Sequence, residues 1–269
     1  MTGSFSSRNY YTENGTLLLA KGSPITIEML GRLKQYKGIR FGEADTNLEA
    51  EKRKYQESTQ RIARQFKGIN EQTLHQVNSL LIRVIFQSKQ KSWWMYVNAL
   101  SHYLDWLYTH SIDVAMISLL IGVEMNYPEK ALWELGLGAL LHDVGKLLIP
   151  KRILQKLAPL NPPEKMILGQ HCELGMDALA GCSLPEASTN IIIQHHERLD
   201  GSGYPCSLKG EQISEYTQIV MIADVFDAIT AGRPYKKSKG PEDALLILNN
   251  QSEKFSKEFL EVLEAILRD

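Results

Sequence analysis

The sequence predicts a mainly helical protein, in which a helical bundle follows a small N-terminal α/β segment. The bundle is predicted because apolar residues recur at helical spacing from about residue 72 onward, between breaks rich in Gly and Pro. The α/β segment is predicted because short apolar runs between turn residues come first. We therefore expect an α/β segment over residues 1–46, a helical linker or cap over 47–95 and a helical domain over 96–269.

Composition restricts the class of protein and its partners. Hydrophobic residues make up 43% and charged residues 23% of the 269 residues, as in ordinary globular proteins. The net charge of −1 gives no overall attraction for a nucleic-acid polymer or an anionic membrane. Any affinity for a phosphate-bearing ligand must therefore come from a local site.

Cysteine use and the N-terminus indicate a cellular location. Cys172, Cys182 and Cys206 are odd in number and lack C-x-x-C spacing, which argues against a disulfide framework and favours a reducing compartment. The first residues lack a signal peptide, and we find no apolar run that approaches the roughly 20 residues of a membrane span. We expect a cytoplasmic protein.

Turn residues define the elements of the N-terminal segment. Asn14-Gly15 predicts a turn, followed by an apolar strand over residues 16–20. After a second turn at residues 22–24, a helix is expected over residues 26–36, ended by a following glycine. Residues 39–41 indicate another short strand.

Residues 47–66 are charged and predict a helix with one apolar seam. Leu48, Tyr55, Ile62 and Ile69 recur every seven residues, but the companion apolar positions are mostly missing. A long coiled coil is therefore not expected. The seam would pack on the main domain, leaving the rest of the helix in solvent, or on a partner.

Helix after helix is predicted beyond residue 72, with no internal repeat. The predicted breaks lie near the glycines and prolines at 68, 88–92, 127–128, 150, 159–163, 181–185, 201–210 and 232–241. The tryptophans at 93 and 94 are expected in the core, with a dimer surface as the alternative.

The stretch "LGLGALLHDVGKLLIP", residues 135–150, is predicted as an apolar helix interrupted by His142, Asp143 and Lys146. Burying a His-Asp pair is costly unless the groups are paired or bind a metal ion. Asp143 and Lys146 are three residues apart and share a face. Gly145 removes a side chain beside them, which indicates that something approaches closely.

Further candidate ligands follow at similar intervals, each on its own predicted helix: His110, His171, the adjacent pair His195-His196, and Asp224. Inward-facing residues of a bundle can converge on one point. A ligand set of imidazoles and carboxylates suits a catalytic iron, manganese or zinc centre better than a closed structural zinc site.

Single histidines carry little weight, and His75 and His102 are interpreted as core or surface residues. The adjacent pair His195-His196 is more informative. Neighbouring residues on a helix point about 100° apart, so such a pair serves two ions better than one. Asp143 has two oxygens that could bridge two ions, which would hold a water nucleophile and neutralise phosphate oxygens. The alternative is a helix end capped by polar residues.

These residues, with the stretches "HHERLDGSGYP" (195–205) and "ADVFDAITAGRPYKK" (223–237), resemble the HD-GYP branch of the HD superfamily of metal-dependent phosphohydrolases. The resemblance runs from about Ser101 to the C-terminus. It implies an HD-superfamily helical bundle, two or three metal ions, often iron or manganese, and hydrolysis of cyclic di-GMP to linear pGpG or GMP. Some members of the family act on cyclic GMP-AMP.

The resemblance also implies roles for individual residues. Asp143 and Lys146 would be catalytic, with Lys146 near the nucleophile or the scissile phosphate. Substrate contacts would come from Gly203, Tyr204, Arg233 and Lys236, although the Arg-Pro-Tyr segment at 233–235 could instead be a loop that packs the bundle. The glycines at 201 and 203 would permit positive φ and close ligand approach. The metal ligands would be His110, His142, Asp143, His171, His195, His196 and Asp224.

One position departs from the family pattern. Members with three metals place a Glu one helical turn before the first ligand His, and this chain has Trp106 there. Since indole cannot ligate a metal, we expect a dinuclear site holding two divalent transition-metal ions, and we expect these to be iron or manganese.

Three functions remain open at this point. The first is hydrolysis of cyclic di-GMP by a metal-activated water, and the second is hydrolysis of another cyclic dinucleotide or phosphoester. The third is a non-catalytic domain that senses nucleotide or interacts with a protein. No ligand of the dinuclear set is missing, which favours the enzymes. A homodimer or a signalling protein partner is possible for each.

Overall fold

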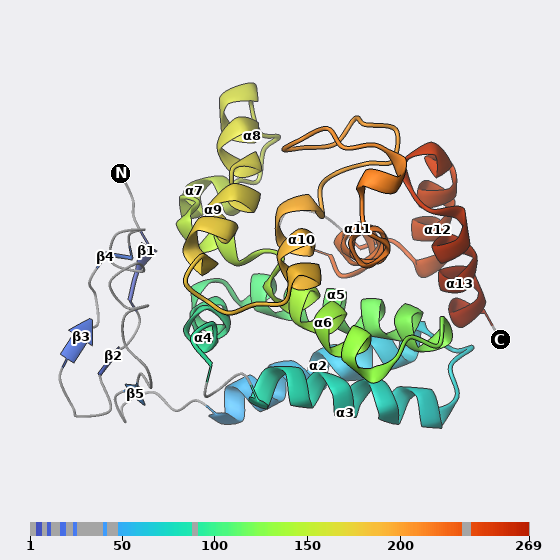
Figure 1. Cartoon of the computed structure of the whole chain (residues 1–269), viewed down its shortest axis with the longest axis horizontal. Helices are drawn as coiled ribbons and strands as arrows, with labels where there is room; N and C mark the ends of the chain where they lie inside the picture. Colours follow the sequence, from blue (N-terminus) through green and yellow to red (C-terminus); the bar gives the residue numbers. More distant parts are fainter. Residues whose placement is uncertain are drawn as a thin grey trace.

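The fold is described from a computed structural model (Figure 1). It describes residues 4–6, 10–11, 17–19, 24–25, 40–41, 48–87, 91–232 and 238–268. The described part beyond residue 47 is helical, which confirms the predicted fold class.

Short antiparallel strands form the described part of the N-terminal segment. Strand β1 (Ser4–Phe5) pairs with β4 (Pro24–Ile25). Strand β2 (Tyr10–Tyr11) lies between β3 (Leu17–Leu19) and β5 (Arg40–Phe41). The predicted strands at 16–20 and 39–41 are therefore present as β3 and β5. The predicted helix over 26–36 and the turn at 14–15 lie outside the described residues, so the α/β character of this segment stays a prediction.

Helices begin and end close to the predicted breaks. Pro128 precedes one helix, Asn161 caps another through a capping box, and the Ser214 hydroxyl accepts a hydrogen bond from Thr217 N at the start of a third. The helical elements are α2 (Leu48–Gln65), α3 (Glu71–Gln87), α4 (Trp94–Tyr103), α5 (Asp105–Glu124), α6 (Glu129–Leu141), η3 (Val144–Leu148), α7 (Lys151–Leu154), α8 (Pro162–Gly169), α9 (His171–Leu179), α10 (Glu186–Gln194), η4 (Gly210–Gln212), α11 (Glu215–Thr230), α12 (Pro241–Asn249), η5 (Ser252–Lys254) and α13 (Lys257–Leu267).

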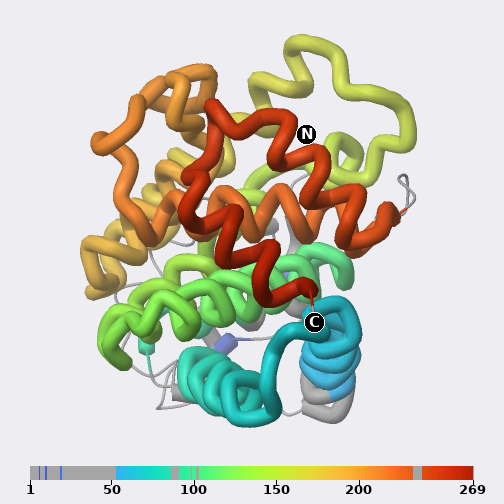
Figure 2. Tube along the Cα trace, turned by 90° about the vertical axis from the view of Figure 1, so that its right-hand side faces the viewer, coloured from blue at the N-terminus to red at the C-terminus, as the bar shows by residue number. Residues whose placement is uncertain are grey.

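Helix α5 is the centre of the bundle. It packs against α2, α3, α4, α6, α11 and α13 (Figures 1 and 2). Its 20 residues are long and apolar enough to cross a membrane, so the expectation that no such run exists was wrong. However, 83% of its apolar window is buried inside the protein, which is what the core helix of a bundle requires.

Helices α2 and α3 lie side by side against α5, on one side of the bundle (Figure 2). The predicted seam of α2 faces the core, because Ile62 is fully buried and Tyr55 is partly buried against the same cluster. Trp93 and Trp94 are also buried in the core, as expected. The helix of residues 48–65 therefore packs on the main domain.

Candidate metal centre

Seven side chains meet inside the bundle, and they are the seven predicted ligands. They form two groups, and within each group the potential ligand atoms lie within 4.8 Å of one another. The first group is His110, His142 and Asp224, and the second is Asp143, His171, His195 and His196. All are buried except His196, which is partly exposed.

The His-Asp pair lies in a turn, not inside a continuous helix as expected for residues 135–150. Helix α6 ends at Leu141, and Asp143 precedes the 3₁₀ helix η3. In a 3₁₀ helix, side chains three residues apart eclipse one another. This geometry places Lys146 Nζ 2.5 Å from Asp143 Oδ2.

Gly145 explains how His171 reaches the pair. A Cβ atom at position 145 would lie 1.8 Å from the backbone O of His171 and 2.6 Å from the N of Gly175. The close approach that the glycine predicted is therefore the backbone of α9, which begins at His171. This packing places His171 Nε2 3.4 Å from Asp143 Oδ1.

His195 and His196 follow directly after α10, since His195 is its C-cap. Their ring centroids are 4.2 Å apart, and both belong to the second group. The expectation that the adjacent pair serves two ions better than one does not match this grouping, because α10 ends at Gln194 and both imidazoles belong to the second group. His196 Nδ1 also lies 3.9 Å from Asp224 Oδ2, across the two groups.

Asp143 lies between the two groups. Its Oδ2 atom is 3.4 Å from His142 Nε2 and 3.6 Å from His110 Nε2. Its Oδ1 atom is 3.4 Å from His171 Nε2 and 3.7 Å from His195 Nε2. Each carboxylate oxygen thus faces the histidines of a different group.

The donor atoms fit a pair of cations. The Nδ1 atoms of His142, His171 and His195 each lie within hydrogen-bond distance of a backbone carbonyl, and that of His110 lies 2.6 Å from Asp227 Oδ2. When each Nδ1 carries the proton, each Nε2 presents a lone pair to the centre.

With the protons on Nδ1, acceptor atoms of different ligands lie at hydrogen-bond distance from one another with no proton between them. The Nε2 atoms of His171 and His195 are 3.2 Å apart, and His110 Nε2 is 3.0 Å from Asp224 Oδ1. Among the residues that the structure describes, the buried atoms His142 Nε2 and Asp143 Oδ1 find no hydrogen-bond partner. Such clustering of buried acceptors is costly unless cations lie between them.

Protonation states agree with this interpretation for the second group. Burial lowers the pKa of His171 to about 3 and also lowers the pKa values of His195 and His196. Burial opposes ionisation of Asp143, but the neighbouring His142 and Lys146 hold its pKa well below the usual range. Neutral imidazoles and an ionised carboxylate are the forms that bind metal ions.

His110 differs from the other ligands. Burial lowers its pKa, but hydrogen bonds to Asp224 and Asp227 outweigh that effect and raise it. Without a cation, a proton therefore competes for this imidazole.

A charged layer behind His110 was missed by the sequence analysis. Asp227 is almost fully buried, contacts His110 and lies 3.1 Å from Arg61 Nη2 of α2. The same guanidinium forms an ion pair with Asp113, which is fully buried on α5. One signal was available for Asp227: it follows Asp224 by three residues on an apolar helix, so the two share a face.

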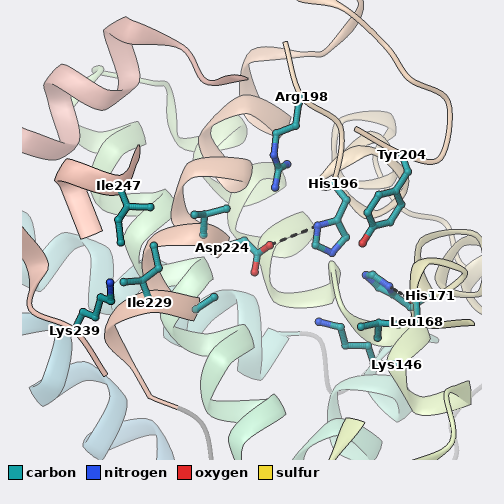
Figure 3. Close-up of a pocket in the computed structure, with 12 residues that line it drawn as sticks. Lys146, Leu168, His171, His196, Arg198, Tyr204, Asp224, Ile229, Lys239 and Ile247 are labelled. Atoms are coloured by element: carbon teal, nitrogen blue, oxygen red, sulfur yellow. Dashed lines mark hydrogen bonds and ion pairs between the residues drawn. The ribbon is translucent and has the colours of Figure 1, made fainter. Parts of the chain in front are cut away.

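A pocket of about 490 Å³ opens over the second group (Figure 3). Lys146, His171, His196 and Asp224 line it, together with Tyr204. The Tyr204 ring stacks on His196 with a centroid distance of 4.8 Å, and 38% of its surface is exposed. This predicted substrate contact therefore lies at the mouth of the pocket. Arg233 and Lys236 lie outside the described residues.

Gly201 has the expected backbone conformation, and Gly203 does not. Gly201 has the predicted positive φ of 82°, whereas Gly203 does not have a positive φ, so that expectation was wrong. A Cβ atom at Gly203 would lie 2.3 Å from the Cα of Glu197. The glycine is needed because the loop crosses its own backbone there.

Two further residues beside the histidine pair were missed. The buried carboxylate of Glu197 accepts hydrogen bonds from Cys206 N (2.6 Å) and Leu208 N (3.0 Å) and so fixes the Tyr204 loop. Arg198 lines the pocket and points toward the space between Asp224 and His196 (Figure 3). Lys239 also lines this pocket, so several cations surround it.

A helical bundle that gathers imidazoles and carboxylates around two adjoining points defines a metal-binding domain. A sequence profile of the HD domain matches residues 95–258, and the chain belongs to this family. Domains of the family bind divalent metal ions, and the two groups supply the donors for them.

Three relatives have assigned activities. A cyclic di-GMP phosphodiesterase of Pseudomonas aeruginosa is 37% identical over 52% of this chain and 34% of its own length. A cyclic di-GMP phosphodiesterase of Thermotoga maritima is 39% identical over 64% of this chain and 47% of its own length. A 3′3′-cGAMP-specific phosphodiesterase of Vibrio cholerae is 35% identical over 52% of this chain and 30% of its own length. The chain thus spans less than half the length of each.

The fold is also similar to a solved structure. An HDG"Y"P protein from Bdellovibrio bacteriovorus superposes with a TM-score of 0.54, covering 98% of this chain and 95% of that chain at 20% sequence identity. This likeness supports the mainly helical fold.

Proposed function

We propose that the chain is a phosphodiesterase that hydrolyses cyclic di-GMP to linear pGpG, GMP or both at a dinuclear metal site. The position of Asp143 carries this proposal, because its two oxygens face two separate groups of histidines. The relatives that hydrolyse cyclic di-GMP support the choice of substrate.

His110, His142 and Asp224 would hold one ion, His171, His195 and His196 the other, and Asp143 both. We propose iron or manganese, because the donor set combines imidazoles with carboxylates and lacks thiolates. Two such ions, when bound, supply an activated water and neutralise the charge that develops on a phosphodiester.

The protein's own residues would bind and orient the phosphodiester. Lys146 is buried and lies at the junction of Asp143 and the pocket, so its ammonium group can contact a phosphate oxygen beside the ions. Arg198 and Lys239 line the same pocket and offer further positive charge. Tyr204 would pack against the substrate at the mouth, and we keep Arg233 and Lys236 as proposed phosphate contacts.

Cyclic GMP-AMP is the second candidate substrate, because a similarly related Vibrio cholerae protein is specific for 3′3′-cGAMP. The two dinucleotides differ in one purine, so the same phosphate site would serve both.

We also propose the wider organisation of the chain. Residues 1–46 would form a small α/β segment, 47–95 a linker or cap, and 96–269 the catalytic domain. We place the protein in the cytoplasm, because a reducing compartment suits three cysteines that lack C-x-x-C spacing. A homodimer or a signalling partner remains part of this proposal.

The decisive experiment combines metal analysis with product analysis. The full chain is purified without oxygen, its metal content is measured per chain, and each cyclic dinucleotide is supplied in turn. We expect two transition-metal ions per chain and release of pGpG or GMP from cyclic di-GMP. Turnover of bis(p-nitrophenyl) phosphate without turnover of any cyclic dinucleotide would reject the substrate, and absence of bound metal would reject the mechanism.

A further inference from the structure

We propose that an apolar pocket beside the metal centre, with Trp106 in its wall, binds one purine base of the cyclic dinucleotide. This inference rests on the proposed function and names a binding site that the ligand set does not predict. The pocket has a volume of about 310 Å³, at the small end of the range of about 300–1,000 Å³ for small-molecule sites.

The position of the pocket relates it to the metal centre. Lys146 and Leu168 line both this pocket and the one over the second ligand group, so the two adjoin at Lys146. Trp106 precedes His110 by four residues on α5, which places the indole on the same face one turn away. A phosphodiester at Lys146 would therefore have one pocket on each side.

This arrangement suits a molecule with two bases. In a cyclic dinucleotide, each phosphate joins two nucleosides, so a base extends on either side of the scissile bond. One base would lie near the stacked rings of Tyr204 and His196, and the other would enter the Trp106 pocket.

The wall of the Trp106 pocket favours an uncharged aromatic ligand. Its described side chains are mostly aliphatic, and they include Leu157, which is 75% exposed. Its two lysines are both engaged elsewhere: Lys146 contacts Asp143 and is assigned to the scissile phosphate, and Lys156 Nζ lies 2.5 Å from Glu164 Oε2. A second phosphate would find no unpaired cation among these side chains, whereas a purine could stack on the indole.

Truncation of two apolar side chains that line the pocket, Trp106 and Leu157, tests the proposal. Trp106→Ala should weaken binding of cyclic di-GMP about tenfold, as loss of one base-stacking contact does. Binding is measured by calorimetry on the metal-loaded full chain with a phosphorothioate analogue of cyclic di-GMP, which is hydrolysed slowly. Trp106→Phe should restore most of the affinity, because it keeps a ring to stack on. The metal content per chain should be unchanged, because Trp106 is not among the seven candidate ligands.

A second variant keeps the test valid if Trp106→Ala does not fold. Leu157→Ala removes an exposed wall residue and should also weaken binding of the analogue, by about threefold. Leu246→Ala is the matched control, because this leucine is 60% exposed and lines a different pocket.

The outcomes separate the two proposals. Equal affinity of the analogue for the wild type, Trp106→Ala and Leu157→Ala would overturn the base site, even in an active phosphodiesterase. Weaker binding by both variants, in a protein that turns over no cyclic dinucleotide, would uphold the base site and reject the enzymatic proposal. Loss of bound metal from Trp106→Ala would show that Trp106 supports the metal centre instead, and would also overturn the base site.

Discussion

The two ligand groups are held in place by different means. In the first group, His110 contacts the carboxylate of Asp227, which is itself near Arg61 of α2. In the second group, His171 and His195 lie against backbone carbonyls of the residues just before them. His110 is therefore oriented by a chain of charges that reaches a helix outside the matched family region, whereas His142, like His171 and His195, is oriented by a local backbone carbonyl.

Because of this difference, a substitution can lower the metal affinity of one ligand group and leave that of the other unchanged. Charge substitutions behind His110 should weaken the first group, whereas disturbance of the contact between Gly145 and α9 should weaken the second. Asp143 faces both groups with its two oxygens, so its loss should affect the whole centre.

The largest effect is expected for Asp143→Ala. Removal of even a residue behind a metal ligand costs about 10- to 100-fold in metal affinity or activity, so loss of the shared ligand should lower turnover by more than about 100-fold. Metal analysis should show loss of both ions. Glu173→Ala, which removes an exposed carboxylate of α9, is the control and should change neither. A variant with two ions and full turnover would contradict the shared role.

Gly145→Ala should disable the second group alone. The added methyl would overlap the backbone of His171, which cannot move without shifting α9, so we expect destabilisation of about 3 kcal/mol or more. Thermal unfolding and metal content should report a lower Tm and loss of one ion. At Gly136 a methyl would meet only the Leu119 side chain, 3.2 Å away, so Gly136→Ala is the matched control. Retention of both ions in Gly145→Ala would argue against backbone positioning.

Asp227→Asn should weaken the first group alone. A neutral amide orients the His110 ring less firmly and makes its Nε2 a weaker donor, so we expect about 10- to 100-fold weaker binding of one ion. Competition with a chelator of graded strength measures this affinity for each ion. Asp243→Asn, an exposed residue of α12, should leave both ions unchanged. The comparison between the groups fails if both affinities fall equally in Asp227→Asn.

Arg61→Gln should have the smallest effect. It leaves the fully buried Asp113 without its cation, which in a dry interior costs about 3–5 kcal/mol. Because the Arg61 side chain is 32% exposed, we expect a smaller loss, about 2 kcal/mol by chemical denaturation. Adding Asp113→Asn should restore part of it.

Arg53→Gln on the same helix is the control for Arg61. It breaks an exposed pair with Glu57 and should change stability by no more than about 0.5 kcal/mol. Equal stability of Arg61→Gln and the wild type would show that α2 contributes no charge to the first group.

Much of the molecule could be predicted from the sequence, because the predictions used local signals. Glycine and proline predicted the helix ends, and the spacing of polar residues in apolar stretches indicated which side chains gather. The turn at His142 could not be predicted, because it depends on the packing of α9 against Gly145, a contact between distant segments. Arg61 was missed for the same reason: on a charged helix, nothing local distinguishes it from its neighbours.

The ligands come from α5, the turn after α6, the start of α9, the end of α10 and α11. The ligands are spread from His110 to Asp224, so the centre exists only once these distant segments have docked. Ions that bind only the folded protein, in which these segments are docked, shift the folding equilibrium toward it. Cation supply should therefore act as a maturation signal, and chains made under metal starvation should be the ones that proteases remove first.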